Sequence, residues 1–132
     1  MDEQPLAEYR IAFEAREGYL YASVTGANTV ETIRRYSADV RAACVRSSRT
    51  RALVVVNLSG PGLGMLDVYK AVAESSDATV GMDLRAAYVD LNPEHGAENM
   101  HLAESVAATR GIPVRTFRDI AAAEAWLLAT GD

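Results

Sequence analysis

The sequence is poor in the side chains that metal and disulfide chemistry require. Its one cysteine, Cys44, excludes an intramolecular disulfide and a zinc site built from several thiolates. Its two histidines, His95 and His101, are six residues apart, so on one helix they would point in different directions. His101 with Glu98 or Glu104 would make only half a metal site. We therefore expect no metal and no cofactor, and the lone cysteine fits a reducing compartment.

Long apolar runs are also missing. The first residues, MDEQPLAE, are acidic and contain no apolar segment of the kind found in signal peptides. Every apolar run is far shorter than the ~20 residues that span a bilayer. A chain of 14.2 kDa is large enough for one hydrophobic core. We expect a cytoplasmic protein with a flexible N-terminal tail at 1–8 and one domain at 9–132.

Positive charge is scarce overall and concentrated in one segment. Lys and Arg number 13 against 18 Asp and Glu, and this acidic balance argues against a nucleic-acid partner. Arg34 and Arg41 belong to an arginine-rich stretch that is predicted to be the exposed face of a helix. Such a face would suit an anionic membrane surface, a phospholipid head group or an acidic protein. Alternatively, Glu31 and Asp39 would pair with Arg34 and Arg35 within the helix, leaving an ordinary solvated face.

The most informative stretch is Arg51 to Gly64, in which an uncharged strand runs into a glycine-rich turn. Residues 53–56 are apolar at every position, which is typical of a central strand covered on both faces. A helix directly after such a strand implies a crossover to a parallel neighbour. The fold is predicted to be α/β, with a mixed five-stranded sheet, about four helices and the order ββαβαβα with a possible extra helix.

The remaining elements are predicted from hydrophobic periodicity and capping signals. Asn28 and Glu31 form a capping box at the start of the first helix, and Asn92-Pro93 starts the third. The predicted strands are 9–15, 19–25, 51–58, 85–91 and 112–117; the predicted helices are 29–46, 65–75, 93–110 and 119–128; and 76–84 is predicted to be a loop.

Several of these segments together resemble one known family. They are the hairpin, the strand ending Val-Val-Asn-Leu, the Gly-Leu-Gly turn, and an ending that reads Arg110-Gly-Ile-Pro-Val-Arg-Thr-Phe-Arg-Asp and then Glu124-Ala-Trp-Leu. This arrangement, from Tyr9 to Leu128, resembles the STAS domain, and more narrowly its SpoIIAA-like (STAS/SEC14-type) branch. The resemblance implies a non-catalytic regulatory domain that docks a partner protein or holds a nucleotide or an apolar ligand near the turn. A lipid or apolar-ligand carrier of SEC14 type is the alternative.

In members of that family that antagonise anti-sigma factors, a serine after an aspartate accepts a phosphate at the start of the helix. The corresponding segment here is Ser59-Gly-Pro-Gly-Leu-Gly64, so Gly60 occupies the phosphoacceptor position and Ser59 that of the aspartate. Phosphorylation would then require a register shifted by one residue, with Ser59 as the acceptor.

The turn after the central strand is the predicted binding edge. Helix N–H groups there suit a phosphate or carboxylate, but no Gly-Lys-Ser/Thr follows as in a P-loop. The alternative is that the glycines only serve a tight strand-to-helix connection. A carrier would have an apolar cavity lined by Leu63, Met65, Leu66 and Tyr69, whereas a partner-binding module would expose them. The predicted binding residues are Ser59, Gly60, Gly62, Leu63, Gly64, Leu66 and Tyr69.

Residues for catalysis are not brought together by the sequence pattern. Cys44 falls on the apolar face of a helix, as inert core cysteines do. Ser59 lacks a Gly-x-Ser-x-Gly setting and an evident histidine partner. The histidines are interpreted as ordinary polar residues on a solvated helix face. We therefore expect no enzyme, with catalysis at the same edge as the alternative. An association of two copies through the hairpin or the helices stays open.

Overall fold

The structure, a computed structural model, describes residues 8–129. Apart from Glu8, the predicted N-terminal tail lies outside this range. The elements are β1 (Arg10–Arg16), β2 (Tyr19–Ala27), α1 (Val30–Ser47), β3 (Arg51–Ser59), α2 (Met65–Thr79), β4 (Arg85–Asp90), α3 (Ala97–Ala108), β5 (Val114–Phe117) and α4 (Ile120–Ala129).

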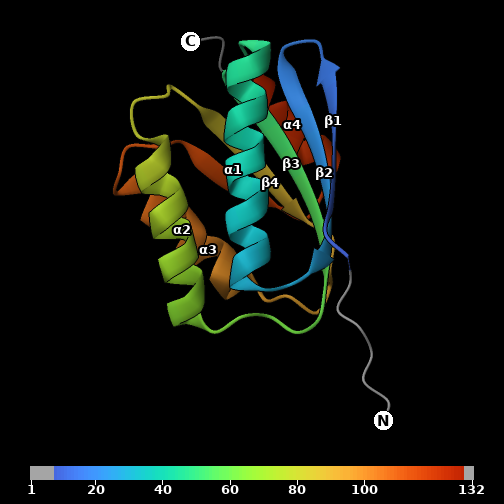
Figure 1. Ribbon diagram of the computed structural model, residues 1–132, viewed down its shortest axis with the longest axis vertical. Coiled ribbons are helices and arrows are strands. Elements are labelled where there is room, and N and C mark those ends of the chain that lie inside the picture. Colours follow the sequence, from blue (N-terminus) through green and yellow to red (C-terminus); the bar gives the residue numbers. More distant parts are fainter. Residues whose placement is uncertain (1–7, 130–132) are drawn as a thin grey trace.

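One mixed sheet organises the chain. Its strands lie in the order β1-β2-β3-β4-β5, and β1 pairs with β2 antiparallel as a hairpin. The pairs β2–β3, β3–β4 and β4–β5 are parallel. Figure 1 shows the strands running side by side behind α1, with β3 at the centre. The predicted α/β class, the five-stranded mixed sheet and the four helices are confirmed.

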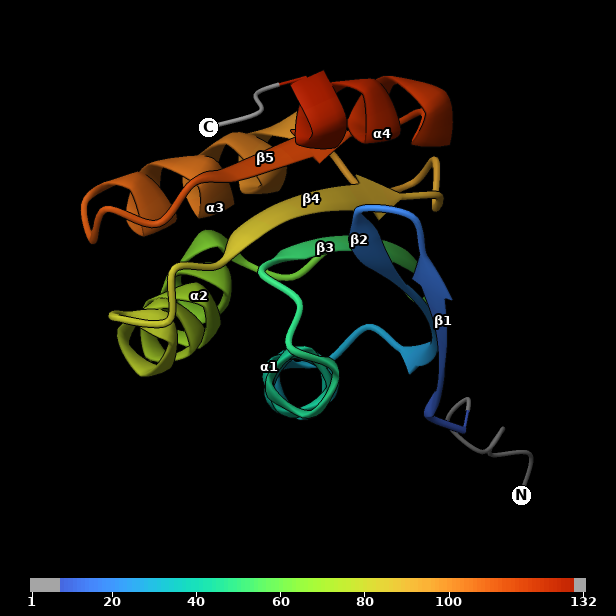
Figure 2. The same ribbon diagram turned by 90° about the horizontal axis from the view of Figure 1, so that it is seen from above.

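The two faces of the sheet have separate cores because side chains alternate along each strand. Figure 2 shows α1 on one side of the sheet and α4 on the other. Val54 and Val56 face α1, whereas Leu53 and Val55 face α4, and all are buried. This two-sided burial explains why β3 is apolar without alternation.

The helix α2 occupies an unusual position. It packs against α1 and α3, and among the described residues it makes no extensive contact with any strand. The helix therefore bridges its two neighbours above β3 and β4. This arrangement leaves space between the helix and the sheet.

The predicted order of elements was incomplete. It left out the strand that the sequence itself predicts at 112–117; the structure has this strand as β5, between α3 and α4, and the full order is ββαβαβαβα. Two helix boundaries also differ. Helix α2 continues to Thr79, into the segment predicted to be a loop, and α3 begins at Ala97 rather than at Pro93.

The predicted capping box at the first helix was wrong. Thr29 is the N-cap, and its side chain accepts a hydrogen bond from the Thr32 backbone N–H. Asn28 does not cap the helix, because its side chain donates to the Pro61 carbonyl in the turn that follows β3. Here a tertiary contact decides between two adjacent capping residues.

None of the helices within 8–129 combines the length and the apolar character needed to cross a bilayer.

Candidate ligand-binding site

A cavity of about 170 Å³ lies between α2 and the sheet. Its size can be compared with an engineered apolar cavity of roughly 150 Å³ that binds benzene. Most of its wall is apolar and comes from the helices α1, α2 and α3 and from the strands below them. The apolar lining includes Ile33, Val56, Leu58, Leu63, Val68, Val72, Leu84, Met100, Ala103 and Ile112. A small apolar molecule would fit such a wall.

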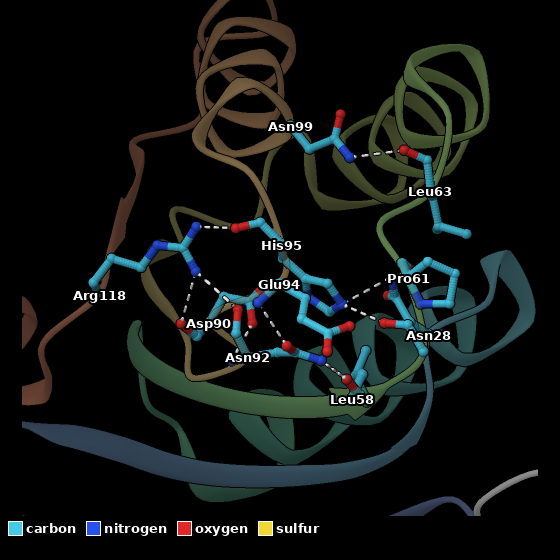
Figure 3. Close-up of polar contacts among 11 residues, drawn as sticks. Asn28, Leu58, Pro61, Leu63, Asp90, Asn92, Glu94, His95, Asn99 and Arg118 are labelled. Atoms are coloured by element: carbon cyan, nitrogen blue, oxygen red, sulfur yellow. Dashed lines mark hydrogen bonds and ion pairs between the residues drawn. The ribbon is translucent and has the colours of Figure 1, made fainter.

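One end of the cavity is closed by the turn that joins β3 to α2. Gly60 has a φ of +105°, a backbone conformation that residues other than glycine rarely adopt. The Asn28 side chain donates to the Pro61 carbonyl at 2.8 Å, and the Asn99 side chain donates to the Leu63 carbonyl at 2.9 Å. Figure 3 shows these two contacts on either side of the turn. The turn is thus held by side chains from α3 and from the β2–α1 connection.

His95 fastens the same turn to the end of β4. It is 7% exposed, and its Nδ1 lies 2.7 Å from Asp90 Oδ2. Its Nε2 lies 3.0 Å from the Gly60 carbonyl oxygen and 3.3 Å from the Asn28 amide nitrogen. Both ring nitrogens therefore have partners within the protein. The arrangement positions the turn and leaves neither nitrogen free to act on a substrate.

The loop that carries His95 is itself braced (Figure 3). The Asn92 side chain donates to the Leu58 carbonyl at 2.7 Å, and the Asn92 backbone N–H donates to Asp90 Oδ1 at 2.9 Å. The guanidinium of Arg118, the residue that directly follows β5, donates to the carbonyls of Asp90, Asn92 and His95. Polar contacts thus join the ends of β3, β4 and β5 into one edge.

Two tyrosines from different elements line the cavity. The rings of Tyr36, on α1, and Tyr88, on β4, have centroids 6.3 Å apart. Burial raises the pKa of Tyr88 to about 12, and burial also raises the pKa of Tyr36. Both phenols therefore stay neutral near pH 7, able to donate and to accept a hydrogen bond.

The residues predicted to bind a ligand are divided between the cavity and the surface. Gly62 and Leu63 line the cavity. Ser59, Gly60 and Gly64 are exposed along the turn. Leu66 and Tyr69 are 66% and 46% exposed, on the outer side of α2 with Met65. Of the two arrangements left open by the sequence, Leu66 and Tyr69 therefore have the exposed one, because this helix packs sideways on α1 and α3.

The arginine-rich face of α1 is used differently from the prediction. The Arg34 side chain pairs with Glu74 of α2 at 2.9 Å, and that of Arg41 donates to the Ser75 hydroxyl at 3.2 Å. Arg35 lies over the Tyr9 ring. The predicted pairs within the helix were replaced by contacts between elements.

The cysteine and the two histidines, considered above as a nucleophile and as metal ligands, lie in three different environments. Cys44 is a residue of α1 and is buried in the core, and burial raises the pKa of its thiol, as expected for an inert cysteine. His101 is exposed on α3. His95, however, is buried and lies before α3, so the interpretation of both histidines as solvated helix residues was wrong for His95. No three His, Cys, Asp or Glu side chains within residues 8–129 are grouped as a metal site.

The sequence pattern did not identify the side chains that brace the turn. Asn28 and Asn92 were predicted only to cap helices, and Asp90, Asn99 and Arg118 were assigned no role. One available signal was that Asp90 and Asn92 lie at the carboxyl end of the predicted strand 85–91, a neighbour of β3. Carboxyl ends of parallel strands share one edge of a sheet, where ligands of α/β folds bind.

In comparisons with known proteins, no family model matched the chain, and no match to a curated protein was found.

Proposed function

We propose that the chain is a non-catalytic binding domain of SpoIIAA-like, STAS type that holds a small amphipathic ligand beneath α2. The observation that carries the proposal is the cavity of about 170 Å³ between α2 and the sheet. It lies behind the strand-to-helix turn, at the edge where open α/β sheets take ligands. The hairpin of β1 and β2 and the turn after β3 are among the segments on which the family resemblance rests.

The composition of the wall favours a ligand that is mostly apolar and carries a polar group. The sides are aliphatic and aromatic, whereas Asn28, His95 and Asn99 lie at the turn. Pockets for drug-sized ligands run to roughly 300–1,000 Å³. The cavity is smaller, so it favours a compact molecule over the lipid of a SEC14-type carrier.

The contacts at the edge favour binding over catalysis. His95 is enclosed, and each of its ring nitrogens already contacts a group of the protein. A general base must reach its substrate within hydrogen-bond distance. The Asp90–His95 pair therefore serves in this proposal as a brace for the turn.

A partner-binding module is the second candidate function. Its support is the exposed apolar group on the outer side of α2, made by Met65, Leu66 and Tyr69, which are 57%, 66% and 46% exposed. A partner would cover this group from outside, whereas a small ligand would enter beneath the helix. The contacts of Arg34 and Arg41 with α2 disfavour a free anion-binding face for a membrane.

The substitution Ala103→Leu tests the proposal by filling the cavity. Ala103 lines the cavity from α3, so the larger side chain should occupy the space that a ligand needs. In a titration with toluene followed by amide chemical shifts, we expect wild-type protein to bind and the variant to lose at least tenfold in affinity.

The matched control is Ala108→Leu, the same substitution at an exposed position of the same helix. It should bind toluene as the wild type does. Equal affinity in all three proteins would place toluene elsewhere and contradict the proposal. Thermal unfolding of each variant shows whether Ala103→Leu still folds, and a shorter Ala103→Val variant is used if it does not.

A further inference from the structure

Three hydroxyl groups on the cavity wall have no hydrogen-bond partner within residues 8–129. They belong to Tyr36 of α1, Ser76 of α2 and Tyr88 of β4. Tyr36 and Ser76 are 9% and 6% exposed. Buried hydroxyls are normally paired, because an unpaired one loses the hydrogen bonds that it made with water.

These hydroxyls are nevertheless not sealed in the protein. Among side-chain atoms of the described residues, Arg85 Nε alone is both fully enclosed and unpaired. The three hydroxyl oxygens must therefore have accessible space beside them, and all three residues line the cavity. The neighbouring hydroxyls of the wall are already engaged: Thr79 donates to the Ser75 carbonyl, and Thr116 donates to Glu104.

From this distribution we infer that the ligand beneath α2 is a small molecule with a hydrogen-bonding group directed at Tyr36, Tyr88 and Ser76. The inference rests on the proposed function and adds the chemical class of the ligand. Its apolar body lies against Val56, Val72 and the aliphatic wall, and its neutral hydroxyl, carbonyl or amide group meets the tyrosine hydroxyls.

A neutral group suits this position better than a charged one. Tyr36 is buried and Tyr88 is partly buried, and Asp90, on the same strand as Tyr88, lines the same cavity. Asp90 acts electrostatically on Tyr36, and Arg41 acts on Tyr88, but the Arg41 guanidinium already donates to Ser75. A buried carboxylate or ammonium would need a free opposite charge to offset its loss of hydration.

Water is the competing occupant. A water molecule needs two to four polar partners, and a mostly apolar cavity tends to stay dry. The three hydroxyls would hold a few water molecules, but the aliphatic wall would leave most of the space without polar partners. An amphipathic molecule would hydrogen-bond to the hydroxyls and also fill the space beside the aliphatic side chains.

The test compares two probes of nearly equal shape, phenol and toluene. Each is titrated against the wild type, against a Tyr36→Phe, Tyr88→Phe double variant and against Ser76→Ala, with amide chemical shifts as the readout. We expect the double variant to bind phenol about tenfold more weakly, as for the loss of a hydrogen bond or two. Toluene affinity should stay within about twofold, and Ser76→Ala should show a smaller loss for phenol only.

The outcomes separate this inference from the proposed function. Toluene and phenol binding that is unchanged in all variants would overturn the inference and leave the proposed function standing. Failure of both probes to bind the wild type would overturn both. The variants should fold, because each removes an oxygen that has no partner; thermal unfolding checks this, and the Ser76→Ala data alone decide if the double variant is destabilised.

Discussion

Asp90→Ala should destabilise the protein by about 3 kcal/mol, because it removes two hydrogen-bond acceptors from the loop after β4. Asp90 Oδ2 lies 2.7 Å from His95 Nδ1, and Oδ1 accepts from the Asn92 backbone at 2.9 Å. The His95 side chain is 8% exposed, so water cannot easily replace the lost partner. Urea unfolding measures the change.

Asp90→Asn is the control for this prediction. Its amide oxygen keeps one acceptor and its volume fills the same space, so about 1 kcal/mol should be lost. Hydrogen exchange should also show faster opening of the turn at 59–64 in Asp90→Ala than in Asp90→Asn. A loss below about 0.5 kcal/mol for Asp90→Ala would mean that the Asp90–His95 contact does not brace the edge.

Leu127→Ala should cost about 3 kcal/mol, because Leu127 is 0% exposed in the core between α4 and the sheet. The truncation leaves a void among Tyr19, Leu53 and Val89, and the single helix on this face offers few ways to refill it. Guanidinium unfolding, analysed with a fixed slope, gives the difference.

The adjacent residue provides the comparison. Leu128 is 40% exposed, and Leu128→Ala should cost less than about 1 kcal/mol. Similar losses of unfolding free energy in the two variants would contradict the conclusion that α4 packs on the sheet through Leu127. Toluene binding should survive in Leu127→Ala at temperatures where it remains folded, since the cavity lies on the opposite face of the sheet.

Much of the fold could be predicted because strong local patterns agree with it. Leu53 to Val56 identified the central strand, and the alternating runs identified the hairpin. The last helix was predicted at 119–128, and its residues Ala123 and Leu127, four apart and so on one side, are buried in the core. These patterns depend only on which side chains are buried, and burial is visible in the sequence as the spacing of apolar residues.

The site could be predicted only in outline. The turn and its edge followed from β3, but the start of α3 did not, because Asn92 uses its side chain on the Leu58 carbonyl. Its side-chain oxygen accepts from the Glu94 backbone, which forms a turn before the helix. A contact 34 residues away in the sequence thus overrides a strong local start signal.

The cavity could not be predicted from the sequence. Helix α2 carries apolar residues at helical spacing, and such a pattern favours packing on a sheet. The helix rests instead on α1 and α3, so Leu66 faces outward and Val68 inward. Whether space remains below a helix depends on which neighbours support it, and no local pattern encodes that.

The most direct test of ligand binding beneath α2 is a nuclear Overhauser experiment on methyl-labelled protein with toluene. We expect cross-peaks from the toluene ring to the methyl groups of Val56 and Val72, which line the cavity. Cross-peaks to the exposed methyl groups of Leu66 and Met65 alone would place toluene on the outer side of α2 and contradict the account.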